Sequence, residues 1–177
     1  IFLRLIDIVI FTVGLILYRK LLERTGVSKK LLNVVFMLLV LTPAVPFLAG
    51  QVNYDNLLFT VVAGILVLTQ RFIGELTEKK RFNLQAFVLL IGVAALSSLV
   101  KYAFLPILMA LGVYMLVALV RFYRRTTWKK LKKDLQKQVR SYTKARIILL
   151  SLFIIVSGSL FFERYGVNLV RYHSPTP

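Results

Sequence analysis

The sequence predicts an all-α fold, a polytopic bundle of about six transmembrane helices. Hydrophobic residues make up 58% of the 177 residues and the mean hydropathy is +0.77, values that do not describe a water-soluble surface. Several apolar segments approach the roughly 20 residues that a helix needs to cross a hydrocarbon core of about 30 Å. A soluble helix bundle would show a polar face along each helix, whereas Val34–Leu41 and Leu105–Leu119 show none.

Six apolar segments are candidates for these spans. They are Leu5–Tyr18, Leu31–Ala49, Leu57–Ile73, Leu84–Val100, Ala103–Val120 and Ile147–Phe162. In the second segment, Pro43 and Pro46 prevent an uninterrupted regular helix, because proline lacks an N–H and its ring clashes with the preceding turn. We expect the chain to bend there and to present the sequence Asn53–Asn56 at the membrane interface.

The distribution of basic residues predicts the orientation of the spans. The chain has 24 Lys and Arg residues against 7 Asp and Glu, a net charge of +17, and cytoplasmic loops of membrane proteins collect Lys and Arg. The first, third and fifth loops of a six-span chain hold every basic residue except Arg4, Lys101, Arg164 and Arg171. The sequence therefore predicts a multi-pass membrane protein with both ends of this chain outside the cytoplasm.

The most basic loop, Arg121–Arg146, is predicted to form an amphipathic helix at the cytoplasmic membrane surface. Its apolar residues recur at helical spacing on one face, and they are Trp128, Leu131, Leu135, Val139 and Tyr142. Such a helix places its apolar stripe among the lipid headgroups and its basic residues over anionic lipid. Calmodulin-like or nucleic-acid partners fit the same pattern, but membrane tethering at both ends favours anionic lipids and no nucleic acid.

These features divide the chain into four predicted parts. They are a core of five spans in residues 1–120, a basic linker helix in 121–146, a sixth span in 147–163 and an extracytoplasmic tail in 164–177. The absence of Cys excludes disulfides and thiolate chemistry, and a single His excludes a His-rich metal centre. The sequence indicates no cofactor, and it leaves open whether a divalent metal ion binds. Because the first residue is Ile1, we expect the chain to be part of a longer protein.

Candidate binding residues gather on the predicted outer face. The loop between the second and third spans contains Asn53, Tyr54 and Asp55 and no basic residue. One interpretation is that Asp55 or Asn56 caps the third span, because these side chains accept hydrogen bonds from free backbone N–H groups. Another is that Asp55 also faces a polar substrate, and the two interpretations are compatible.

Two further pairs of polar residues belong to the same face. Lys101 and Tyr102 lie between the fourth and fifth spans, where they can anchor the hairpin at the interface or bind a phosphate at the bilayer surface. Arg4 and Asp7 lie one helical turn apart. Since ionisable groups within a span are costly and are expected to pair, these two are predicted to form an ion pair, although Arg4 is also available to an anionic ligand.

At these residues the sequence resembles two groups of membrane proteins. Arg4–Asp7, followed by an apolar span and Leu17–Leu22, resembles the second transmembrane helix of GT-C glycosyltransferases. Leu41–Pro43, Asn53–Leu57 and Lys101–Pro106 are similar to motifs of the DUF2142 family of bacterial membrane proteins. The resemblance covers about Phe2 to Leu119.

The resemblance implies a GT-C-like enzyme of the bacterial plasma membrane with a polyprenyl-phosphate sugar as donor and a cell-envelope acceptor. It places the catalytic acid in a loop upstream of Ile1, so this chain contributes no catalytic residue. Our hypothesis is that Arg4 and Lys101 bind the donor phosphate, while the sugar or acceptor contacts Asn53, Tyr54 and Asp55, with Tyr102 also in the substrate-binding set. The alternatives are a transporter or flippase for a lipid-linked substrate, with polar groups near mid-membrane, and a non-catalytic membrane scaffold.

Overall fold

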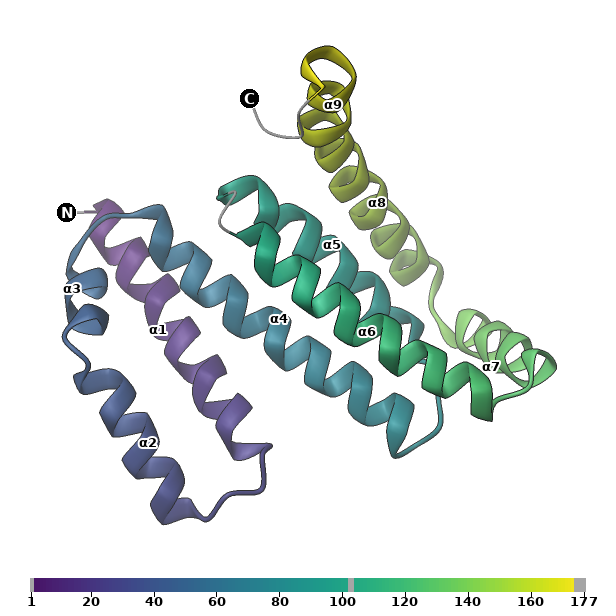
Figure 1. Ribbon diagram of the computed structural model, residues 1–177, viewed down its shortest axis with the longest axis horizontal. Coiled ribbons are helices and arrows are strands. Elements are labelled where there is room, and N and C mark those ends of the chain that lie inside the picture. Colours follow the sequence, from purple (N-terminus) through teal and green to yellow (C-terminus); the bar gives the residue numbers. More distant parts are fainter. Residues whose placement is uncertain (1, 102–103, 174–177) are drawn as a thin grey trace. The chain divides into compact units, whose positions relative to one another are not determined.

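The computed structural model describes residues 2–101 and 104–173, and each element in these ranges is a helix (Figure 1). The chain separates into two compact units, residues 1–67 and 68–177. Helix α4, Tyr54–Thr77, runs from the first unit into the second. The predicted all-helical class is therefore confirmed for the described residues.

The first unit contains three helices besides the beginning of α4. They are α1 (Phe2–Glu23), α2 (Lys29–Leu41) and α3 (Ala44–Gly50). Gly26 permits the turn after α1 because its φ of 77° lies in the left-handed region, and the Ser28 side chain caps α2. Helices α2 and α3 meet at an angle of 57° at the Thr42–Pro43 break, which confirms the predicted bend.

Helices α1 and α4 approach each other closely at a glycine. A Cβ atom on Gly14 would lie 2.6 Å from Thr60 Oγ1 and 2.8 Å from the Phe59 ring. The same Thr60 hydroxyl donates to the Ile10 carbonyl at 2.6 Å, and the Phe11 and Phe59 rings stack with centroids 4.7 Å apart. Small residues and interhelical hydrogen bonds of this kind are how helices associate in lipid.

The second unit contains the rest of α4 and six further helical elements. They are α5 (Leu84–Val100), α6 (Leu105–Arg125), α7 (Trp128–Ser141), α8 (Lys144–Phe161), the π-helical turn η2 (Phe162–Gly166) and α9 (Val167–Tyr172). Asn83 caps α5 by accepting from the Ala86 N–H at 2.9 Å, and Thr143 caps α8 in the same way. Both caps follow the preference for Asn and Thr at helix starts.

Helices α5 and α8 pack through small residues. A Cβ atom on Gly92 would overlap the Phe153 ring of α8, and Ser97, Ser98 and Ser157 are buried. The Tyr165 hydroxyl in η2 donates to the Ser98 carbonyl at 2.6 Å. This contact helps to keep the chain helical beyond Phe162, where the last span is predicted to end. The chain continues through η2 into α9, which ends at Tyr172.

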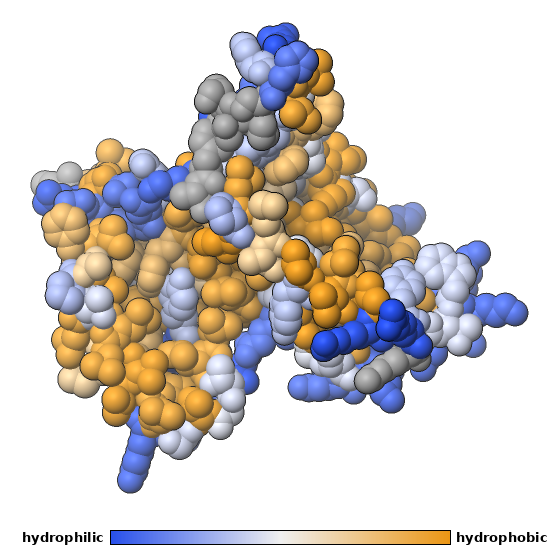
Figure 2. Space-filling model, in the orientation of Figure 1, coloured by the Kyte–Doolittle hydropathy of each residue, from blue (hydrophilic) through white to orange (hydrophobic). Residues whose placement is uncertain are grey.

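Three helical segments of the described chain are long and apolar enough to cross a membrane: Tyr54–Thr77, Leu105–Arg124 and Lys144–Tyr172. A fourth is counted if α2 and the bent α3 form one span. Of the other two predicted spans, α5 has 17 residues and α1 carries charges near both of its ends. Figure 2 shows a largely apolar surface along the helices, with hydrophilic residues gathered toward helix ends. A membrane protein is thus supported, and the count of six spans stays a prediction.

The basic helix α7 is placed differently from the prediction. Leu131 is only 4% exposed and belongs to an apolar cluster of the second unit, against which Leu135 also packs. The buried members of this cluster besides Leu131 are Phe72, Leu76, Phe82, Ala86 and Phe122. Trp128 and Val139 are exposed. The expectation that the whole stripe faces lipid headgroups was therefore wrong, because protein covers Leu131 and Leu135 packs partly against the same cluster.

Candidate functional site

The start of α4 carries a group of hydrogen-bonded polar side chains, here called the α1–α4 polar cluster: Asp7, Asn53, Asp55 and Asn56. Asp7 Oδ2 accepts from the Asn53 backbone N–H at 3.2 Å and from Asn56 Nδ2 at 2.5 Å. A carboxylate at this position also faces the positive end of the α4 dipole. The cluster therefore joins α1 to the beginning of α4.

Asn56 extends this connection to α3. Its Nδ2 lies 3.0 Å from the Leu48 carbonyl oxygen and 2.9 Å from that of Gln51, and the residue is completely buried. Its Oδ1 atom has no hydrogen-bond partner in the described part of the chain. One side-chain amide thus serves acceptors in α1, in α3 and in the loop after α3. Buried polar groups need hydrogen-bond partners, and these contacts explain why an Asn is tolerated at this buried position.

Asn53, and not Asp55 or Asn56, caps α4. Asn53 Oδ1 accepts from the Asp55 backbone N–H at 3.2 Å, and Asn53 Nδ2 donates to Asp55 Oδ2 at the same distance. The prediction that Asp55 or Asn56 is the cap was wrong by two or three positions, because Asn53 is the residue that precedes the first helical turn. The structure does bring together Asn53 and Asp55, two of the predicted binding residues.

Arg4 does not pair with Asp7. No ion pair joins the two among the described residues, because the Asp7 carboxylate turns to the Asn53 and Asn56 donors instead. Arg4 is exposed, and its neighbours Phe2 and Leu3 are 75% and 67% exposed. The predicted ion pair is therefore wrong, and the Arg4 guanidinium is exposed beside apolar side chains.

The remaining predicted site residues are arranged as follows. Tyr54 is exposed in the first turn of α4. Lys101 belongs to the second unit, follows the last residue of α5 and is partly buried; its carbonyl accepts from the Phe104 N–H at 3.0 Å. Tyr102 lies outside the described residues. The predicted set is therefore distributed over both units.

A second polar network, which the sequence does not predict, links α7 to the loop before α5. Gln138 Nε2 donates to the Phe82 carbonyl at 2.5 Å, and its Oε1 accepts from the Leu84 N–H at 3.0 Å. Asn83 Nδ2 donates to Glu75 Oε2 at 2.6 Å. Only the Asn83 cap carries a recognisable sequence signal, an Asn directly before an apolar run.

Comparisons with protein families, curated proteins and solved structures found no match for this chain. The resemblance to GT-C and DUF2142 proteins therefore stays a hypothesis that depends on short motifs. Among the described residues, no group of three His, Cys, Asp or Glu side chains is arranged to hold a metal ion. Function has to be argued from the polar residues and the surface around them.

Proposed function

We propose that this chain is part of an integral membrane protein that binds the anionic headgroup of a lipid-linked substrate near the start of α1. The substrate class that we favour is a polyprenyl-phosphate sugar, and the activity is transfer of that sugar to a cell-envelope acceptor on the extracytoplasmic face. The observation that carries the proposal is the exposed Arg4 guanidinium, which Asp7 does not neutralise. The protein would be a bacterial plasma-membrane enzyme of the GT-C type.

The surroundings of Arg4 fit such a headgroup. A polyprenyl phosphate presents an anion at the interface and a long apolar tail, so its binding surface needs a cation beside apolar side chains. Arginine forms strong charge-assisted hydrogen bonds to phosphate oxygens, and exposed Phe2, Leu3 and Leu5 flank it on α1. The α1–α4 polar cluster supports this surface by fixing α1 against α4.

The other predicted residues receive separate roles in the proposal. Tyr54 and Asp55, in the first turn of α4, contact the sugar or the acceptor, and Asn53 holds Asp55 in place. Lys101, at the end of α5 in the second unit, stays a predicted phosphate-binding residue, with Tyr102 next to it in sequence.

One observation favours a second candidate, a non-catalytic membrane scaffold. Asp7, Asn53 and Asn56 make hydrogen bonds that hold α1, the loop after α3 and α4 together. Those contacts account for the three residues without any substrate. In a scaffold, Arg4 and Lys101 would serve only as interfacial anchors.

The test is binding and turnover of a polyprenyl-phosphate sugar by the full-length protein in nanodiscs. We expect turnover, and we expect Arg4→Gln and Lys101→Ala each to weaken polyprenyl-phosphate binding by about tenfold, since each removes a charge-assisted contact. Lys29→Gln, which neutralises an exposed lysine at the start of α2, should leave the affinity unchanged. Absence of turnover would favour the scaffold, and unchanged affinity in both variants would contradict the assigned phosphate contacts.

A further inference from the structure

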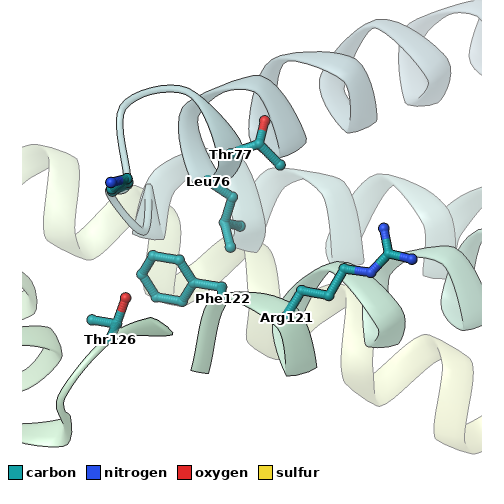
Figure 3. A pocket seen from close by; sticks show the side chains of 6 residues that line it. Leu76, Thr77, Arg121, Phe122 and Thr126 are labelled. Carbon is teal, nitrogen blue, oxygen red and sulfur yellow. The ribbon is translucent and has the colours of Figure 1, made fainter. Parts of the chain in front are cut away.

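The second unit has a small hollow between the C-terminal ends of α4 and α6. It has a volume of about 170 Å³ and is lined by Leu76, Thr77, Lys80, Arg121, Phe122 and Thr126. Figure 3 shows Leu76 and Phe122 pointing toward one another, with Arg121 and Thr126 to either side of them. At roughly 30 Å³ per water molecule, the hollow has room for a phosphate group but not for a whole phospholipid.

Two cations line this hollow without being neutralised. Neither the Lys80 ammonium nor the Arg121 guanidinium takes part in a hydrogen bond or ion pair among the described residues. Glu75, an acid on the same stretch of α4, is already engaged by Arg71 and Asn83. No carboxylate belongs to the described lining, so the hollow combines unpaired positive charge with an apolar wall.

The backbone of Lys80 is unusual for a lysine. Its φ is 49°, in the left-handed region, and the next N–H, of Arg81, donates back to the Glu75 carbonyl at 3.1 Å. This bond spans six residues, one more than the bond that closes a Schellman motif, and a left-handed residue such as Lys80 lies where glycine is normally preferred. Glycine would adopt this conformation without steric cost, whereas the lysine adds a positive charge to the lining of the hollow.

The position of the hollow in the chain indicates what occupies it. Both α4 and α6 are apolar enough to cross a membrane, so their ends belong at the depth of the lipid headgroups. Basic pockets between transmembrane helices bind anionic lipid headgroups. We propose that this hollow is a specific binding site for the phosphate of an anionic phospholipid, whose acyl chains lie along the apolar surface of α4 and α6.

Two other hollows near α7 are less suited to this role. One, of about 210 Å³, is lined by Arg81 and Lys137 but also by Asp134, whose carboxylate opposes an anion. The other, of about 500 Å³, lies along α7 beside Trp128 and Lys132. Neither of these hollows is lined by residues of two candidate membrane spans. Lining by two spans is the property that would place the lipid chains beside the headgroup.

The proposal is tested by counting the phospholipids that stay bound to the full-length protein after extraction from nanodiscs. The nanodiscs contain phosphatidylcholine with or without phosphatidylglycerol, and native mass spectrometry measures retention. We expect selective retention of phosphatidylglycerol, reduced about tenfold by Arg121→Gln or Lys80→Gly. Lys80→Gly should also keep or raise the thermal midpoint, because glycine relieves the left-handed backbone, so a loss of lipid would not reflect unfolding.

Matched controls separate a specific site from general charge. Lys79→Gln and Arg124→Gln remove the same charge from exposed neighbours that do not line the hollow, and both should retain the lipid. Equal losses in these controls would overturn the proposal, and so would unchanged retention in Arg121→Gln and Lys80→Gly. Displacement of phosphatidylglycerol by millimolar inorganic phosphate would show a site for free phosphate and would also overturn it.

Discussion

Asn56 is the residue on which the beginning of α4 most depends. Its side-chain amide lies within hydrogen-bond distance of the Asp7 carboxylate and of two backbone carbonyls, those of Leu48 and Gln51. An amide has two N–H donors, so the three acceptors share them. Removing this side chain would take a donor away from these part-buried acceptors, and unsatisfied groups cost more than the hydrogen bonds themselves contribute.

We therefore expect Asn56→Ala to destabilise the full-length protein by about 1–3 kcal/mol. The measurement is the denaturation midpoint in detergent, with Asn33→Ala as the control. Asn33 is an exposed asparagine in α2, so its replacement should have little effect. Equal midpoints for the two variants would show that the α1–α4 polar cluster does not stabilise the fold.

The sequence identified most members of this cluster but not their contacts. The sequence indicates that the Asp7 charge needs a partner, and Arg4, one helical turn away, is the candidate that it offers. The actual donors lie 46 and 49 positions along the chain. Pairings over such distances depend on how helices pack, which one sequence without relatives does not reveal. The Asn53 cap depends only on neighbouring residues, but the sequence offers three candidates in a row, Asn53, Asp55 and Asn56, and the predicted cap at Asp55 or Asn56 is wrong.

At the scale of helices, α5 and α8 are held together by a close approach at Gly92. A methyl group there would overlap the Phe153 ring, whereas a Cβ on Gly112 of α6 would meet nothing within 4 Å. We expect Gly92→Ala to destabilise the protein by about 1–3 kcal/mol through overpacking. Gly112→Ala should be neutral or stabilising by up to about 1 kcal/mol, because alanine favours helix.

Thermal midpoints of the two glycine variants check this prediction. A second variant, Gly92→Ala with Phe153→Leu, should recover part of the loss because the smaller side chain makes room for the methyl group. If Gly92→Ala and Gly112→Ala shift the midpoint equally, α5 and α8 are not packed at this glycine.

The helices themselves were more predictable than their packing. All six predicted segments contain or overlap helices of the structure, and the bend at Pro43 follows from proline chemistry. The burial of Leu131 was not predictable, because periodicity places it on the apolar face of α7 without saying whether lipid or protein covers that face. The helix after Phe162 is not predictable for a related reason, since nothing in residues 163–172 indicates the Tyr165 contact to Ser98.

For the chain as a whole, charge and apolar surface point to the same environment. Large apolar side chains are exposed along α1, α2, α6 and α8, an arrangement that water would not tolerate over so many helices. The basic residues instead gather near helix ends and in α7. Segregation of this kind is expected when lipid surrounds the middle of each helix. It predicts on which side of the membrane each loop lies, and this can be measured.

Single cysteines test the predicted topology directly, because this sequence contains none. We expect Lys79→Cys and Lys133→Cys to be protected from a membrane-impermeant maleimide in intact cells, since basic loops stay in the cytoplasm. Gln51→Cys and Tyr172→Cys should be labelled; all four positions are exposed in the structure. Labelling of Lys133→Cys from outside would contradict the orientation. If Gln51→Cys and Lys79→Cys were both protected or both labelled, α4 would not cross the membrane, and the six-span count would have to be abandoned.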